Sequence, residues 1–173
     1  MLLVVGILAA WIGGCAAPAP PSSTGLALSV TAPIEIPTGR AHAVFRQGRL
    51  VGGGSRLDPY CELEVRSVSG DEPQRITTGD FRVSRVTHRV LLDPTTRIPP
   101  LALMSSCLDP LFQESIWWLT SVELSDVLFL RCINPYYNCA FGPPLTPSEV
   151  QEQLGHYLMV HTIAPETITP GRW

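Results

Sequence analysis

Much of the chain alternates apolar and polar residues with a period of two, which is typical of strands with one buried face. In the run YCELEVR at residues 60–66, apolar side chains take every second position and charged side chains take the others. The run FRVSRV at 81–86 repeats this pattern, although strict alternation breaks near Arg85. The run AHAVF at 41–45 is a further strand that ends at Gln47-Gly48. Strands with one wet face predict an antiparallel sheet.

The strongest strand patterns lie further along the chain. Residues 116–124 and 127–132 are rich in β-branched and aromatic residues, and Ser125-Asp126 between them suits a hairpin turn. We expect both to be core strands. By contrast, prolines punctuate residues 93–114, which predicts a long irregular connection with one helical turn near Leu111.

One helix start is well marked, in the sequence LTPSEV at 145–150. Thr146 can cap the helix, Pro147 suits its first position, and Glu149 completes a capping box. Leu145 and Val150 can form the hydrophobic staple on either side of the cap.

Gly155 is a natural stop, so the helix should have about two turns. Residues 156–163 then predict a final strand. A helix that continues to Val160 is the alternative, because Val150, Leu154, Tyr157 and Leu158 would also share one helical face.

These patterns predict a single, mainly β domain over residues 26–164. We expect an antiparallel sandwich or partly closed barrel of about six to eight strands, with one short helix near the C-terminus. Residues 165–173 read as a loose tail. Residues 16–25, AAPAPPSSTG, have no apolar periodicity and predict an extended tether.

The first fourteen residues are too short to span a membrane comfortably. Residues 2–14 carry no charge and would form a helix of roughly 20 Å, against a hydrocarbon core of about 30 Å. A short apolar run followed by small residues fits a cleaved export signal better.

The sequence Ile12-Gly13-Gly14-Cys15 resembles the lipobox of bacterial lipoproteins. The resemblance implies that residues 1–14 are a signal peptide. The mature chain would begin at a lipidated Cys15, and residues 15–25 would form the lipidated end and its flexible tether. The acyl chains on Cys15 would hold the protein at the membrane. Lipoproteins that are retained in the inner membrane often carry Asp directly after the lipidated cysteine. This chain has Ala16 there, so the resemblance implies the outer membrane, with the domain facing the periplasm. The segment departs from the pattern in having no Lys or Arg before Cys15, which points to a weak orientation signal or a start upstream of Met1.

Four further cysteines, Cys61, Cys107, Cys132 and Cys139, suggest two disulfides in an oxidising compartment. Three connectivities are possible; we favour Cys132 with Cys139, which lie close in sequence, and Cys61 with Cys107. Unpaired thiols are the alternative. No C-x-x-C spacing supports a metal site, and no cofactor is expected. A net charge of −3 argues against nucleic-acid binding.

No catalytic signature stands out. Glu62 and Glu64 share one strand face and could form a carboxylate pair, but a solvated strand face explains them equally well. Trp117 and Trp118 are adjacent in a strand, so they point to opposite faces and one of them is a possible binding surface.

FRQG at 45–48 and DPYCELEVR at 58–66 look similar to stretches of small uncharacterised proteobacterial lipoproteins, a resemblance that brings no activity. We therefore expect a non-enzymatic binding or assembly module whose partner is an envelope protein or cell-wall material. The alternative is an envelope hydrolase that uses Glu62, Glu64 or Asp58.

Overall fold

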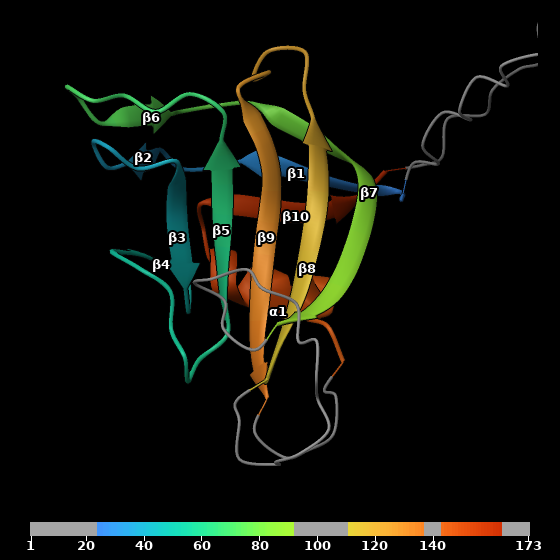
Figure 1. Cartoon of the computed structure of the whole chain (residues 1–173). Helices are drawn as coiled ribbons and strands as arrows, with labels where there is room; N and C mark the ends of the chain where they lie inside the picture. Colours follow the sequence, from blue (N-terminus) through green and yellow to red (C-terminus); the bar gives the residue numbers. More distant parts are fainter. Residues whose placement is uncertain (1–23, 92–110, 137–142, 164–173) are drawn as a thin grey trace, which may run out of the picture.

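The protein folds mainly into strands, as the sequence predicts, and the sheet curls into a half-barrel (Figure 1). The computed structural model describes residues 24–91, 111–136 and 143–163. The elements, in chain order, are β1 (Leu26–Val30), β2 (Ile34–Ile36), β3 (His42–Arg46), β4 (Arg49–Val51), β5 (Tyr60–Val65), β6 (Gln74–Ile76), β7 (Asp80–Leu91), β8 (Leu111–Thr120), β9 (Val127–Tyr136), α1 (Pro147–Leu154) and β10 (Leu158–Thr162).

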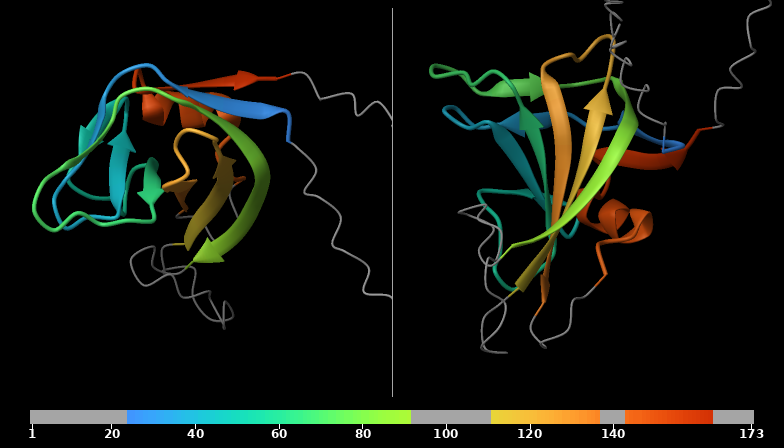
Figure 2. Two further views of the ribbon diagram at one scale, coloured as in Figure 1. Left: turned by 90° about the horizontal axis from the view of Figure 1, so that it is seen from above. Right: turned by 45° about the vertical axis from the view of Figure 1, so that its right-hand side comes forward.

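Eight of these strands form one antiparallel sheet in the order β10-β1-β7-β8-β9-β5-β3-β4, and β2 pairs with β6 separately. The two views of Figure 2 show the large sheet curving around, with α1 lying beside β1 and β10. The inner face of the sheet and the apolar side of α1 enclose the main core, which contains Phe45, Leu63, Phe81, Trp117 and Leu154. We call the opposite side of the sheet the outer face.

Long-range pairing extends two strands beyond the limits that the sequence predicts. β7 continues to Leu91, with a bulge between Val83 and Arg85 where the alternation breaks. The helical turn expected near Leu111 is wrong, because β8 begins there and Phe112 pairs with both Leu91 and Pro135. Hydrogen bonding to a strand on each side outweighs local preference at this position. The rest of the proline-rich connection, residues 92–110, lies outside the described residues.

The β8–β9 hairpin turns earlier than expected. β8 ends at Thr120, and residues 121–126 form the connection to β9, so the strand expected to reach Leu124 stops four residues sooner. Asp126 at the end of this connection accepts hydrogen bonds from the backbone and side chain of Ser67, at 3.2 and 2.7 Å. The connection between β8 and β9 is therefore held by hydrogen bonds to Ser67, just after β5, and β8 and β9 do not pair with each other within it.

Two glycines make the contact between the β3–β4 hairpin and the end of α1. Gln47 and Gly48 both have positive φ, 50° and 73°, as a two-residue hairpin turn requires. The Gly48 N–H donates to the carbonyl of Gln153 at 3.0 Å, so the hairpin satisfies the C-terminal end of the helix. A Cβ at Gly155 would lie 2.5 Å from the Gly48 Cα, which leaves no room for a side chain.

The predicted start and stop of α1 are confirmed. Thr146 is the N-cap, Pro147 opens the helix, and the capping box with Glu149 is complete. Leu145 and Val150 are both buried in the main core, as the staple requires. After Gly155 the chain forms β10, so the final strand is confirmed and the longer helix is not formed. Within the described residues, no helix has the length and apolarity needed to cross a membrane.

The capping box makes the helix sensitive to acid. The backbone N–H of Thr146 donates to Glu149 Oε2 at 2.7 Å, and this bond, with a second from the Thr146 hydroxyl, lowers the pKa of Glu149. Because the pKa is lower in the folded protein, the carboxylate stabilises the fold above its unfolded-state pKa of about 4.3. That contribution is lost as the pH falls through the folded-state value.

We expect Thr146→Ala to lower the free energy of unfolding by about 1 kcal/mol at pH 7, because the helix loses its cap. Glu149→Gln should also destabilise the protein at pH 7, and its difference from wild type should shrink as the pH falls below about 4. Urea denaturation at several pH values measures both effects. A Glu149→Gln difference that grows on acidification would contradict this account.

Candidate functional site

A groove runs along the outer face of β1 because this strand carries small residues there. Ala27 and Ser29 form the floor, while Leu26, Leu28 and Val30 point to the core on the other side. The neighbouring strands carry longer side chains at the same level. In the register, Arg82 of β7 and His161 of β10 flank Ala27, and Asp80 and Met159 flank Ser29. The small floor between taller walls gives a groove of about 680 Å³.

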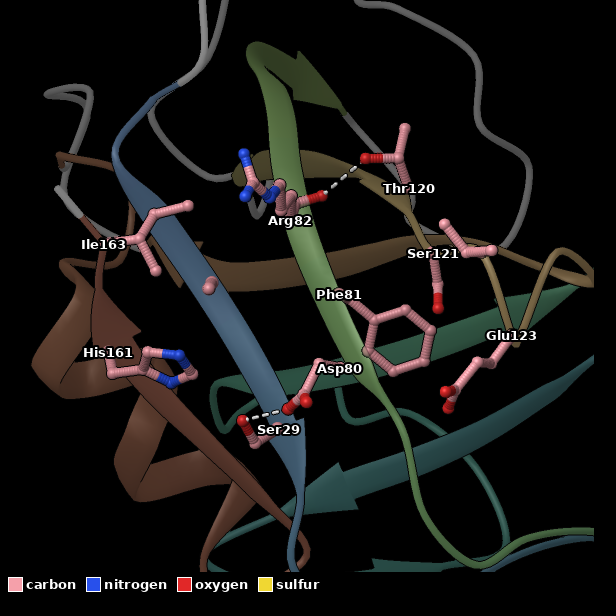
Figure 3. A pocket seen from close by; sticks show the side chains of 11 residues that line it. Ser29, Asp80, Phe81, Arg82, Thr120, Ser121, Glu123, His161 and Ile163 are labelled. Atoms are coloured by element: carbon pink, nitrogen blue, oxygen red, sulfur yellow. Dashed lines mark hydrogen bonds between the residues drawn. The ribbon is translucent and has the colours of Figure 1, made fainter. Parts of the chain in front are cut away.

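Polar and apolar side chains both line this groove (Figure 3). Ser29 donates its hydroxyl hydrogen bond to Asp80, and the Thr120 hydroxyl donates to the Arg82 carbonyl at 3.4 Å. The β8–β9 connection adds Ser121, Val122 and Glu123. The side chain of Val122 is fully exposed, and Met159 is 54% exposed beside the floor. A lining that combines hydrogen-bonding groups with apolar side chains suits recognition of a ligand in extended form.

The groove was not anticipated from the sequence, although a signal was present. In GLALSV at 25–30, the positions that alternate with the leucines are Gly, Ala and Ser. A strand with small residues on one face leaves space on that face, because its neighbours cannot fill the volume above it. Alternation between large and small residues, as well as between apolar and polar ones, was the informative pattern.

A second cluster of functional interest is a row of buried charges on the outer face, across β7, β8, β9 and β5. Arg131 lies opposite Glu62 in the register, with Nη2 to Oε2 at 2.6 Å, and its Nη1 lies 3.5 Å from Glu114 Oε1. Glu114 also pairs with Arg89. Glu114 is completely buried and Arg131 is 5% exposed, whereas the Arg89 side chain is 45% exposed. The charges alternate in sign, so each buried group has an opposite neighbour.

This row changes the interpretation of the two strand carboxylates. The expectation that Glu62 lies on a solvated strand face is wrong, because Glu62 is buried and engaged by Arg131. Glu64 is partly buried, with an oxygen 3.9 Å from His42 Nδ1. Asp58 accepts a hydrogen bond from Ser55 at 3.2 Å in the loop before β5. The described contacts therefore engage the three carboxylates with different partners.

The sequence carried a sign of this burial. Arg131 is the only charge in VLFLRCINPY, and Glu114 is the only charge in LFQESIWWLT, so each is a lone charge in an otherwise apolar strand. A lone charge in such a strand needs a partner of opposite sign, because an unpaired buried charge is too costly. The pattern of β5 alone does not show that its partner comes from β9.

The two tryptophans point to opposite faces, as expected. Trp117 is buried in the main core. Trp118 is partly buried on the outer face, where the Arg85 guanidinium lies 5.0 Å from its ring centre and the Phe129 ring meets it edge-on at 5.3 Å. Its indole N–H donates to the Thr87 hydroxyl at 3.4 Å. Of the two, only Trp118 is placed to contribute to a binding surface.

Within the described residues, Cys61 and Cys132 form a disulfide. The favoured pairing of Cys132 with Cys139, and of Cys61 with Cys107, is therefore wrong. Cys61 and Cys132 lie opposite each other in the β5–β9 register, with Cα atoms 4.0 Å apart. Beyond Cys132 the chain stays extended as far as Tyr136, which carries it away from a local loop closure. Cys15, Cys107 and Cys139 lie outside the described residues.

The described residues contain no group of three or more His, Cys, Asp or Glu side chains arranged to hold a metal ion. Comparison with known proteins adds no relative from which a role could be carried over. The chain matches no protein-family model, and neither curated proteins nor solved structures give a match. Function must therefore be argued from the residues and their geometry.

Removal of Arg131 should destabilise the protein far more than removal of an exposed arginine. Arg131→Met leaves Glu62 and Glu114 buried without their shared partner, which should cost about 3–5 kcal/mol. The matched control is Arg75→Met, because Arg75 pairs with Glu35 at 3.3 Å but both side chains are more than half exposed. That change should cost less than about 1 kcal/mol.

Chemical denaturation of both variants, with the disulfide intact, measures the difference. Equal losses of stability in the two variants would show that Arg131 is not needed to compensate the buried charges of Glu62 and Glu114.

Proposed function

We propose that the chain is a lipid-anchored binding module of the bacterial envelope, held at the outer membrane through acyl chains on Cys15 and facing the periplasm. The lipobox-like Ile12-Gly13-Gly14-Cys15 and the Pro- and Ser-rich segment after it support the anchor. The Cys61–Cys132 disulfide supports an oxidising compartment, where such bonds persist.

The observation that carries the binding role is the groove along β1. Its small floor and taller walls can receive an extended segment of an envelope protein or of cell-wall material, and Val122 and Ile163 offer apolar contacts. Its floor, Ala27 and Ser29, follows closely after Thr24, the first described residue, so the proposed tether would enter beside the ligand. A ligand in this groove would lie close to the anchored end of the domain.

A non-enzymatic role is the better supported of the two functions considered from the sequence. A general acid or a nucleophile must reach its substrate. Glu62 is buried and engaged by Arg131, and Asp58 is bonded within its own loop. These engagements favour recognition over hydrolysis by the strand carboxylates.

The anchor is tested by the intact mass of the non-reduced protein extracted from its native membrane. We expect the mass of residues 15–173 plus acyl chains, less two hydrogens for each disulfide. Cys15→Ser should remove the acyl mass and release the protein from the membrane fraction. An unlipidated mass that still includes Met1 would overturn the lipoprotein proposal.

The groove is tested by filling it. Ser29→Phe places a large side chain on the floor, whereas Ser29→Ala removes only the hydrogen bond to Asp80 and leaves the space open. Binding of each variant to isolated peptidoglycan and to purified candidate envelope proteins is measured by sedimentation and calorimetry.

For a ligand that the wild-type protein binds, we expect Ser29→Phe to weaken binding at least about tenfold, or ~1.4 kcal/mol. Ser29→Ala should stay within about threefold of wild type. Binding by Ser29→Phe at the wild-type level would move the site away from this groove.

A further inference from the structure

β10 is one of the two edges of the large sheet, and no strand of the described part of the chain pairs with its outward backbone groups. β10 pairs with β1 through Met159 and His161, so the N–H and C=O groups of Leu158, Val160 and Thr162 point away from β1. An exposed edge of this kind pairs readily with another strand. Met159, which is 54% exposed, adds an apolar side chain to this edge.

The side chain of Gln151 takes up part of the edge. Its Nε2 donates to the Leu158 carbonyl at 3.0 Å, and its Oε1 accepts from the Val160 N–H at 2.7 Å. The same Nε2 also donates to the Gly155 carbonyl at 2.7 Å. A carboxamide has the same donor and acceptor groups as a peptide unit. Gln151 therefore engages the same two groups of β10, the Leu158 carbonyl and the Val160 N–H, that the N–H and C=O of one residue in a parallel ninth strand would engage.

The helix is fixed at both ends so that Gln151 reaches this position. The capping box at Thr146 sets where α1 begins, and the contact between Gly155 and Gly48 sets where it ends. Val150 and Leu154, on either side of Gln151, are fully buried in the core. The Gln151 side chain lines a hollow of about 470 Å³ between α1 and β10, together with Pro147 and Thr162.

The two bonds to β10 block the pairing that a second copy would make. In antiparallel pairing of β10 with itself, centred on Val160, the two Val160 residues exchange two hydrogen bonds and each Thr162 exchanges two with the opposite Leu158. Of these six bonds, two need a Val160 N–H and two need a Leu158 carbonyl. Gln151 engages both groups in each copy, so it competes with four of the six.

We propose that Gln151 caps the β10 edge and prevents this chain from pairing with a second copy of itself through β10. The cap is a side chain, so its bonds can be removed without changing the strand. The partner that it excludes is specific: another β10, antiparallel and centred on Val160.

The test compares Gln151→Ala with Glu152→Ala, which alters an exposed neighbour on the same helix. Light scattering of the purified full-length variants over a range of concentrations gives the oligomeric state, and hydrogen exchange follows the backbone amides of β10. In Gln151→Ala at low concentration, we expect the Val160 amide to exchange at least about tenfold faster than in wild type. At high concentration this variant should form dimers in which the Thr162 amide gains protection. Wild type and Glu152→Ala should stay monomeric.

A monomeric Gln151→Ala protein at every concentration would overturn the proposal, and so would a dimer without protection at Thr162. Gln151→Asn serves if the alanine variant does not fold, because it keeps the amide but is one methylene too short to bond both groups of β10. It should show the same dimer, formed at higher concentration.

Discussion

The register between β5 and β9 is the constraint on which the rest of the structure depends. Two consecutive residue pairs fix it in opposite ways: Cys61 with Cys132 on the inner face, and Glu62 with Arg131 on the outer face. A slip of one residue would turn the cysteines outward and bring the charges into the apolar core. The covalent bond and the ion pair therefore specify one alignment of β5 and β9, and the rest of the sheet extends from this pair on both sides.

The outer face of the sheet has two different parts, because the side chains on β5 and β9 are long whereas those on β1 are small. Toward β5 and β9, long charged residues pair across strands, and Glu62, Glu114 and Arg131 are buried, so this part is a rigid structural layer. Toward β1, small residues leave a groove lined by both polar and apolar side chains. Arg82 lines the groove and Arg89 belongs to the row of charges. Both lie on β7, so one continuous strand connects the two regions. A rigid layer beside an open groove suits a site whose shape is set before a ligand arrives.

Features encoded within a few neighbouring residues could be predicted from the sequence. The helix at 147–154 is one, because its cap, first position and stop are all local, and β5 is another, because its alternation lies within six residues. The disulfide partner of Cys61 could not be deduced, since Cys132 is 71 residues away and only the strand order brings them together. The burial of Glu62 could not be predicted for the same reason, because its partner Arg131 lies on a strand that is distant in the sequence. The groove depends on what three adjacent strands carry at one level, which no single strand shows.

The described domain begins and ends at one corner, where the Ile163 N–H donates to the Gly25 carbonyl at 2.9 Å. The polypeptide therefore makes a nearly complete circuit, and a short linker could join these two points without disturbing any strand pair. New termini could then be opened in the β8–β9 connection, since residues 121–126 pair with no strand. In such a circular permutant, the chain would begin and end beside Ser121 and Glu123, across the groove from Ile163, so anything fused to a terminus would approach the groove from the opposite side.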